Sequence, residues 1–228
     1  RLNGPDVSAA ILAGGQRGEA SLRTAYLEQI GLRQMTEGLP QLLQCRNDPD
    51  AKVRAAAVAA LGELAPFSEQ GTALAWALAA TDDTEQTRAL RALVNITLRN
   101  PAVAERGRAI YAALENAKPD AALRLIPVLA RLGGTASADC ASRLALRSDT
   151  KIAEAAAAAL GRWTDATALQ ALGTVSEKAT SASVRDTARG SAIRYLERNR
   201  EEWTPEITQV VAQLIAATKN AAPRQQLV

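Results

Sequence analysis

Residues 47–64 read NDPDAKVRAAAVAALGEL and carry the signals of one well-delimited helix. Asp48 or Asp50 can cap its first turn, and Pro49 lies where a missing N–H group costs nothing. Gly62 predicts the C-terminal end of the helix nearby. The apolar stripe has the spacing of one helical face and consists of Val53, Ala57, Leu61 and Leu64. Ala56 and Ala60 flank this stripe, so we expect another helix to approach closely.

Weaker copies of this stretch recur along the chain. Residues 21–31 align with residues 52–62, which places Arg23 opposite Arg54 and Gly31 opposite Gly62. Further copies open near Asp83, Pro119, Asp149 and Val184. Shorter amphipathic segments separate the copies, at residues 6–13, 34–45, 69–80, 102–117, 136–147 and 166–178. A helix pair of this kind cannot bury its apolar face alone, so the pairs are expected to stack into a solenoid.

The composition supports this fold and excludes several functions. Aromatic residues make up only 3% of the 228 residues, and alanine and leucine dominate the apolar fraction, which favours helices packed through small residues. The chain contains no histidine, which excludes His-based acid/base chemistry, Ser-His-Asp triads and His-ligated metals. Cys45 and Cys140 lack CxxC spacing and are interpreted as buried free thiols. No apolar run is long enough to span a membrane.

Residues 48–54, together with the alanines and Gly62 that follow, resemble the second helix of a HEAT repeat. More narrowly, they resemble the bacterial HEAT repeats related to those of phycobilisome lyases, and residues 21–31 and 149–161 share the pattern. This resemblance implies an all-α fold, a right-handed α-α superhelix of the HEAT/armadillo type. We expect about six helical hairpins plus a terminal helix at residues 205–219, in a single domain covering residues 1–228.

A second resemblance covers residues 123–228. Residues 131–134, 159–166 and 188–196 are similar to HEAT regions of secreted proteins from Bacteroidetes and planctomycete-type bacteria. In such proteins the array is often joined to a 3-keto-disaccharide hydrolase domain or another sugar-acting domain. The resemblance implies an accessory module of a glycan-processing protein and a secreted or periplasmic location. Because the sequence begins at Arg1 and not at Met, we expect it to be a piece of a larger protein.

The second helix of each pair usually lines the concave face of a HEAT solenoid. Outward positions there are Arg88, Arg91, Asn95, Arg124, Arg131 and Arg189. Together they would make a basic groove for an acidic protein segment, a glycan acid or nucleic acid, although a charged helix face is often only solvated. We expect the charged residues that recur at one repeat position to bond across neighbouring repeats. They are the arginines Arg23, Arg54 and Arg185 and the aspartates Asp48, Asp83 and Asp149. Binding specificity should therefore lie where the copies differ.

Other conspicuous residues have two interpretations. One of Trp76, Trp163 and Trp203 could stack on a sugar or a base, but core packing between repeats is the favoured interpretation. Pro127 should kink or shorten its helix. Residues 14–19 are glycine-rich but lack the GK[ST] ending of a phosphate loop, so they are interpreted as a turn.

The sequence therefore predicts a non-catalytic helical-repeat scaffold that mediates protein–protein or inter-domain interaction. No catalytic residue, metal site or cofactor is expected, and the predicted partner is a protein or a neighbouring domain of the same polypeptide. The alternative is a HEAT-like DNA glycosylase or another nucleic-acid-binding protein that uses a basic concave face. The net charge of only +3 disfavours that alternative, since nucleic-acid binders usually carry a denser basic stripe.

Overall fold

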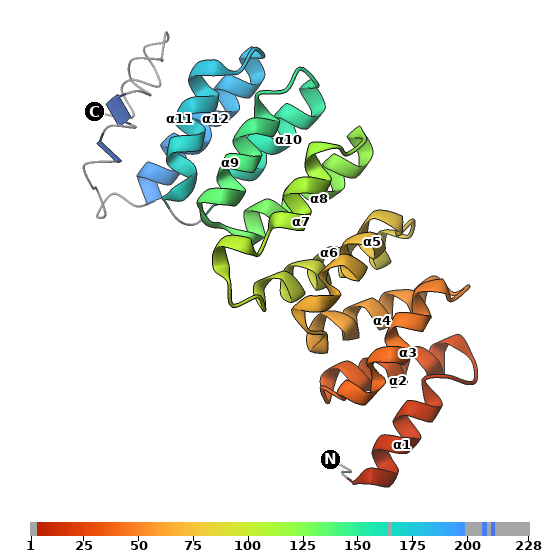
Figure 1. The fold of residues 1–228 in the computed structure, drawn as a ribbon. Coiled ribbons are helices and arrows are strands. Elements are labelled where there is room, and N and C mark those ends of the chain that lie inside the picture. Colours follow the sequence, from red (N-terminus) through yellow and green to blue (C-terminus); the bar gives the residue numbers. More distant parts are fainter. Residues whose placement is uncertain (1–3, 164–165, 199–206, 209–210, 213–228) are drawn as a thin grey trace. The chain divides into compact units, whose positions relative to one another are not determined.

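The computed structural model describes residues 4–163, 166–198, 207–208 and 211–212. The regular secondary structure of this part of the chain is entirely helical, with no β-strand, which confirms the predicted all-α fold of stacked hairpins. The chain divides into two compact units, Arg1–Ala109 and Ile110–Val228 (Figure 1). The predicted terminal helix at 205–219 lies largely outside the described residues, of which 207–208 and 211–212 are helical.

Unit 1 consists of three helix pairs and the short 3-10 turns beside them. The helices are α1 (Pro5–Gly14), α2 (Ala20–Leu32), α3 (Leu39–Gln44), α4 (Ala51–Leu64), α5 (Gln70–Ala79) and α6 (Asp83–Leu98). The 3-10 turns are η1 (Thr36–Gly38), η2 (Cys45–Asn47), η3 (Phe67–Glu69) and η4 (Val103–Glu105). Each pair packs internally, and α4 packs against α2 on one side and α6 on the other. The second helices of the three pairs therefore form one layer, with α4 in its centre.

The central helix α4 is alanine-rich because it is buried on several sides. Gly31 of α2 lies so close to α4 that an added Cβ atom would stand 2.8 Å from the Cα atom of Ala60. At Gly62 of α4 an added Cβ atom would stand 2.7 Å from the Cα atom of Ala92 in α6. Gly62 lies near the C-terminal end of α4, as predicted, and because it is still inside the helix it also allows close helix contact.

Aspartate side chains cap three of the described helices, α4, α6 and α10. The carboxylate of Asp50, not that of Asp48, accepts hydrogen bonds from the backbone N–H groups of the first turn of α4. Helix α6 begins at Asp83 as predicted and is capped by Asp82, whose Oδ1 atom accepts from the N–H group of Glu85 at 2.9 Å. Asp149 caps α10 as predicted. Each cap satisfies an N–H group that lacks a partner within its helix.

Unit 2 repeats the same arrangement. Its helices are α7 (Arg108–Glu115), which begins at the unit boundary, α8 (Pro119–Leu132), α9 (Gly134–Ala145), α10 (Thr150–Leu160), α11 (Thr167–Lys178) and α12 (Ala182–Arg198). Helix α10 packs against both α8 and α12, while α9 packs against α11. Pro127 does not shorten α8, which continues through it to a glycine cap at Gly133, where φ is 67°. Pro127 is exposed, so its ring needs no room in the core.

The core interpretation of the tryptophans is confirmed for the two that are described. Trp76 and Trp163 are both fully buried, and Trp203 lies outside the described residues. Cys45 and Cys140 are buried and free, as predicted. Among the described helices, none combines the length and apolarity that crossing a bilayer requires.

Candidate functional site

Unit 1 contains a groove of about 520 Å³ over the layer formed by α2, α4 and α6. Its floor consists of small residues, namely Gly31, Ala56, Ala59, Ala60, Gly62 and Ala92. Its remaining lining consists of longer side chains, namely Glu28, Leu32, Gln34, Glu63, Arg88, Arg91 and Asn95. This volume lies within the range typical of binding sites, which is about 300–1,000 Å³.

The groove exists because the central helix has methyl groups where its neighbours have long charged side chains. When Leu61 of α4 is aligned with Leu93 of α6, Ala59 coincides with Arg91. The repeat that aligns Gly31 with Gly62 places Glu28 of α2 at this same position. The same repeat position is therefore occupied by Glu28 in α2, Ala59 in α4 and Arg91 in α6. Because the alanine side chain is short, a hollow remains above the middle helix.

Charges of both signs surround this groove. Arg88 and Glu28 form an ion pair in which the Nη1 and Oε1 atoms are 3.9 Å apart, and their side chains are 38% and 49% exposed. Among the described residues, neither Arg91 nor the side chain of Glu63 takes part in an ion pair. The groove therefore presents a positive wall on α6 and a negative wall on α2 and α4.

Two further residues shape the mouth of the groove where α2 ends. Leu32 is 76% exposed, the highest value among the large apolar residues described as exposed. Gln34 has a φ of 51°, a left-handed conformation that is unusual for a residue other than glycine. In this conformation the N–H group of Gln34 donates to the carbonyl of Gly31, and the next N–H group donates to that of Ile30, both at 3.0 Å. These bonds close the C-terminal end of α2.

The structure places the six predicted binding residues in two sets. Arg88, Arg91 and Asn95 line the groove of unit 1 on one face of α6. In unit 2, Arg124 and Arg131 lie on α8. Arg189 lies on α12, where its guanidinium group pairs with Asp186 at 3.1 Å and donates to the carbonyl of Ser176. A single basic groove containing all six stays a prediction. The sequence reasoning missed Glu28 and Glu63, although the differences between aligned copies could have identified both.

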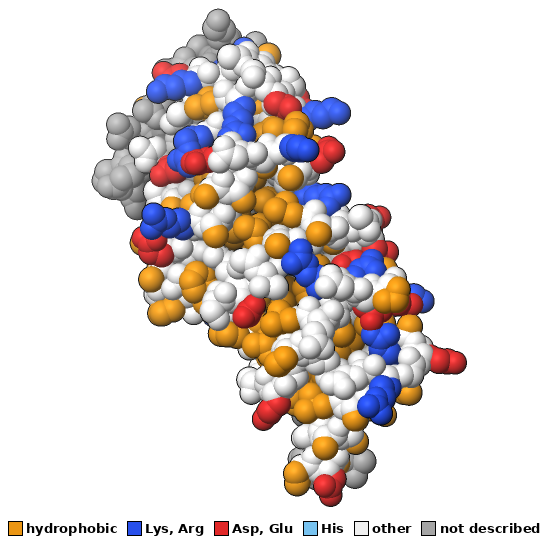
Figure 2. All heavy atoms as spheres, turned by 45° about the vertical axis from the view of Figure 1, so that its right-hand side comes forward, with side chains coloured by type: hydrophobic (Ala, Val, Ile, Leu, Met, Phe, Trp, Pro, Cys, Tyr) orange, Lys and Arg blue, Asp and Glu red, His pale blue; other side chains and the backbone are white. Residues whose placement is uncertain are grey.

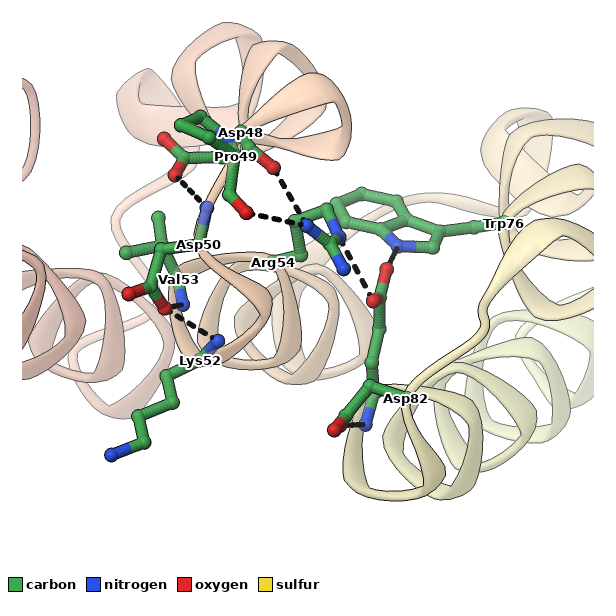
Figure 3. A network of polar contacts seen from close by, with 9 residues as sticks. Asp48, Pro49, Asp50, Lys52, Val53, Arg54, Trp76 and Asp82 are labelled. Carbon is green, nitrogen blue, oxygen red and sulfur yellow. Dashed lines mark hydrogen bonds and ion pairs between the residues drawn. The ribbon is translucent and has the colours of Figure 1, made fainter.

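A second polar cluster joins the hairpins of α3/α4 and α5/α6 (Figure 3). The Nε atom of Arg54 donates to the Oε2 atom of Glu85 at 2.9 Å, and its Nη1 atom donates to the carbonyls of Asp48 and Pro49. The other carboxylate oxygen of Glu85 accepts from the indole Nε1 atom of Trp76 at 2.8 Å. Both oxygens of this buried carboxylate are therefore used, which makes the cluster a connection between repeats.

The equivalent arginines elsewhere also have structural partners. Arg23 forms an ion pair and hydrogen bond with Asp48 of the following repeat, and this hydrogen bond raises the pKa of Arg23 above its usual value. Arg185 donates to the carbonyls of Ala179 and Thr180 at 2.6 and 2.8 Å. The prediction that repeated arginines bond across neighbouring repeats is confirmed for Arg23 and Arg54. Arg185 instead bonds to the loop that precedes its own helix.

Charges elsewhere on the surface are mixed in sign. On the face shown in Figure 2, Lys and Arg side chains lie beside Asp and Glu side chains, with hydrophobic side chains between them. Within the described ranges, no cluster of three His, Cys, Asp or Glu residues has the geometry to hold a metal ion.

Comparison with known proteins identifies the repeat type. The HEAT repeat family model matches residues 39–68, which span α3 and α4. The CpcE–CpcF complex of phycocyanin lyase from Nostoc sp. PCC7120 is a similar structure, with 16% identity and a TM-score of 0.42 over 94% of this chain and 84% of that chain. Human deoxyhypusine hydroxylase in complex with glycerol is similar over 99% of this chain and 83% of that chain, with 16% identity and a TM-score of 0.39. No curated protein matches the chain in sequence.

These comparisons correct one prediction and leave another untouched. The prediction that the chain is not an enzyme is not upheld: the two similar structures are named for a lyase and a hydroxylase, and at 16% identity they assign no activity to this chain. The lack of histidine removes particular mechanisms and does not by itself make a protein non-catalytic. No comparison links the chain to 3-keto-disaccharide hydrolases. What the match and the fold establish together is an all-helical repeat protein that contains a HEAT repeat at residues 39–68.

Proposed function

We propose that the chain is a helical-repeat scaffold whose first unit binds a segment of a partner protein in the groove of α2, α4 and α6. The observation that carries this proposal is the groove itself, a hollow floored by glycine and alanine between charged side chains of two signs. The partner is another protein or a neighbouring domain of the same polypeptide. Such a groove suits a scaffold, and it equally suits an enzyme that must hold a protein substrate.

The lining favours a protein segment over the alternative of nucleic acid. Two glutamates and two arginines surround the groove, so its formal charge is balanced. Phosphate backbones bind where positive charge accumulates, and carboxylates in the groove would repel them. A protein segment can offer small apolar groups to the alanine floor and charges of both signs to its walls. The proposal that this groove serves an accessory module of a glycan-processing protein rests only on the sequence resemblance.

Site-specific photo-crosslinking in cells tests the proposal with a matched pair of positions. A benzophenone amino acid replaces Leu32 at the groove or, as the control, Val103 in η4, because both are large apolar residues, 76% and 68% exposed. Val103 does not line the groove. We expect a discrete protein adduct from position 32 and none from position 103.

A groove-filling variant makes the test specific to the groove. Ala59→Arg gives α4 the residue that α6 has at the equivalent position, and Ala59 is only half-buried, so the longer side chain can extend into the hollow. This variant should abolish the adduct from position 32 while leaving helix content unchanged in circular dichroism. Equal adducts from both positions, no adduct at all, or an adduct that Ala59→Arg does not reduce would each refute the proposal.

A further inference from the structure

The ion pair between Glu28 and Arg88 has an unusual position in unit 1. Glu28 belongs to α2 and Arg88 to α6, and each of these helices packs on α4. The pair therefore connects the first and third helices of the layer and passes over the alanines of the second. Any segment that enters the groove must push this contact aside or replace it.

We propose that this pair is an exchangeable strap and that the occupant of the groove is a charge-separated segment of a partner protein. The segment carries an acidic residue at one end, a basic residue at the other and small apolar residues between them. This inference rests on the proposed function and adds the chemistry of the partner. On binding, the acidic residue pairs with Arg88 and the basic residue pairs with Glu28.

The strap is weak enough to exchange. Its atoms are 3.9 Å apart, at the outer limit of an ion pair, and both side chains are more than a third exposed. Exposed pairs of this kind change an equilibrium by about fivefold at most. One internal pair is replaced by two pairs with the segment, and the segment itself covers both new pairs and excludes water from them, so their charges attract more strongly than those of the exposed strap.

The arrangement of the remaining charges determines how the segment lies. Arg91 is on α6 with Arg88, whereas Glu63 is on α4, which packs against α2, the helix of Glu28. A segment that crosses the helices with its acidic end over α6 meets attraction at both ends. A segment with charges of only one sign meets one attractive wall and one repulsive wall, so it binds less tightly.

Fluorescence anisotropy with defined peptides tests the inference on the full chain. The probe is a fluorescein-labelled peptide of sequence Lys-Lys-Ala-Leu-Ala-Ala-Glu-Glu. The comparison peptides are one of the same composition with Lys and Glu alternating, and one in which every Lys is replaced by Glu. At low ionic strength we expect the charge-separated peptide to bind at least about fivefold more tightly than the other two, and added salt to reduce this difference.

Variants of the strap give effects of opposite sign. Glu28→Gln releases Arg88 and removes one negative charge, so the all-acidic peptide should bind about two- to fivefold more tightly. The charge-separated peptide should bind about twofold more weakly, because the basic contact that it loses is stronger than the exposed strap that it no longer has to displace. Glu37→Gln is the matched control, since Glu37 is also exposed in unit 1 but does not line the groove. It should change neither affinity.

Three results of the peptide measurements would overturn the inference, and each is distinguishable from failure of the proposed function. The first is no binding of the charge-separated peptide, and the second is equal binding of all three peptides. The third is a change of the same sign for both peptides in Glu28→Gln. If an adduct from position 32 still disappears in Ala59→Arg, the groove binds a partner of other chemistry. A concentration-dependent dimer that Ala59→Arg dissociates would make a second copy the occupant and would also overturn the inference.

Discussion

Gly62 permits the closest contact between α4 and α6, and its substitution by alanine should destabilise the chain. In an exposed helical position this substitution stabilises a protein by about 1 kcal/mol, because alanine has the higher helix propensity. At Gly62, however, the new Cβ atom would stand 2.7 Å from the Cα atom and 2.8 Å from the Cβ atom of Ala92. Neither atom can rotate away, so the two helices must move apart.

The expected magnitude follows from these opposing effects. Overpacking a tight interface costs about 1–3 kcal/mol, and a clash with backbone atoms belongs at the upper end of this range. After the gain in helix propensity, Gly62→Ala should lower the free energy of unfolding by about 2 kcal/mol. For a chain of this length that corresponds to a decrease in melting temperature of about 4–8 °C.

Gly71 in α5 is the matched control. An added Cβ atom there would meet no heavy atom within 4 Å, and Gly71 is exposed. Gly71→Ala should therefore raise stability by about 0.5–1 kcal/mol. Thermal and urea unfolding, followed by far-ultraviolet circular dichroism, would compare the two variants. Adding Ala92→Gly to Gly62→Ala should restore only part of the loss, because the clash with the Cα atom remains. Equal stabilisation by both alanine substitutions would refute the close-contact argument.

Three further predictions concern other positions. Gln34→Gly should raise the free energy of unfolding by about 1 kcal/mol, because glycine adopts the φ of 51° without strain, whereas Gln34→Ala should leave it nearly unchanged in the same unfolding assay. Glu85→Gln keeps an acceptor for Trp76 but removes the charge that faces Arg54, so it should cost about 2 kcal/mol, while Glu63→Gln at an exposed position should cost less than about 0.5 kcal/mol. Burial raises the pKa of the Cys140 thiol above its usual 9.0, so the folded state favours the neutral thiol. The folded state therefore has its full stability below pH 9, and the free energy of unfolding should fall as the pH rises further. Urea unfolding at increasing pH should show a smaller fall in the Cys140→Ala variant.

The second helix of each hairpin could be predicted well from the sequence, and so could four of the first helices, at residues 6–13, 69–80, 136–147 and 166–178. Aspartate caps and the apolar spacing locate α4, α6 and α10, because these signals act within one helix. The segment predicted at 34–45 is instead a six-residue α3 between two 3-10 turns. Pro40 in the first turn of α3 lacks an N–H group and prevents the helix from extending further towards the N-terminus. Short helices of this kind depend on packing against the next helix, which a local pattern does not report.

The candidate groove could be predicted only in part, because it depends on a comparison between helices. Arg88, Arg91 and Asn95 are visible as a polar face of one helix. The hollow beside them arises from Ala59, which within its own helix is one alanine among many. Its meaning appears only when α4 is stacked beside α6 and their equivalent residues are compared.

The repeat architecture separates residues that stabilise the stack from residues that are available for binding. Arginines that recur at one repeat position are held by the stack, since Arg23 and Arg54 bond to the following repeat and Arg185 bonds to the loop before its own helix. Such a residue is occupied, and its loss should lower stability. Arg91 has no arginine at the equivalent position of α4, so stacking does not require it. Substitution of Arg91 should therefore alter binding and leave stability unchanged, which makes non-repeated charges the positions to test for function.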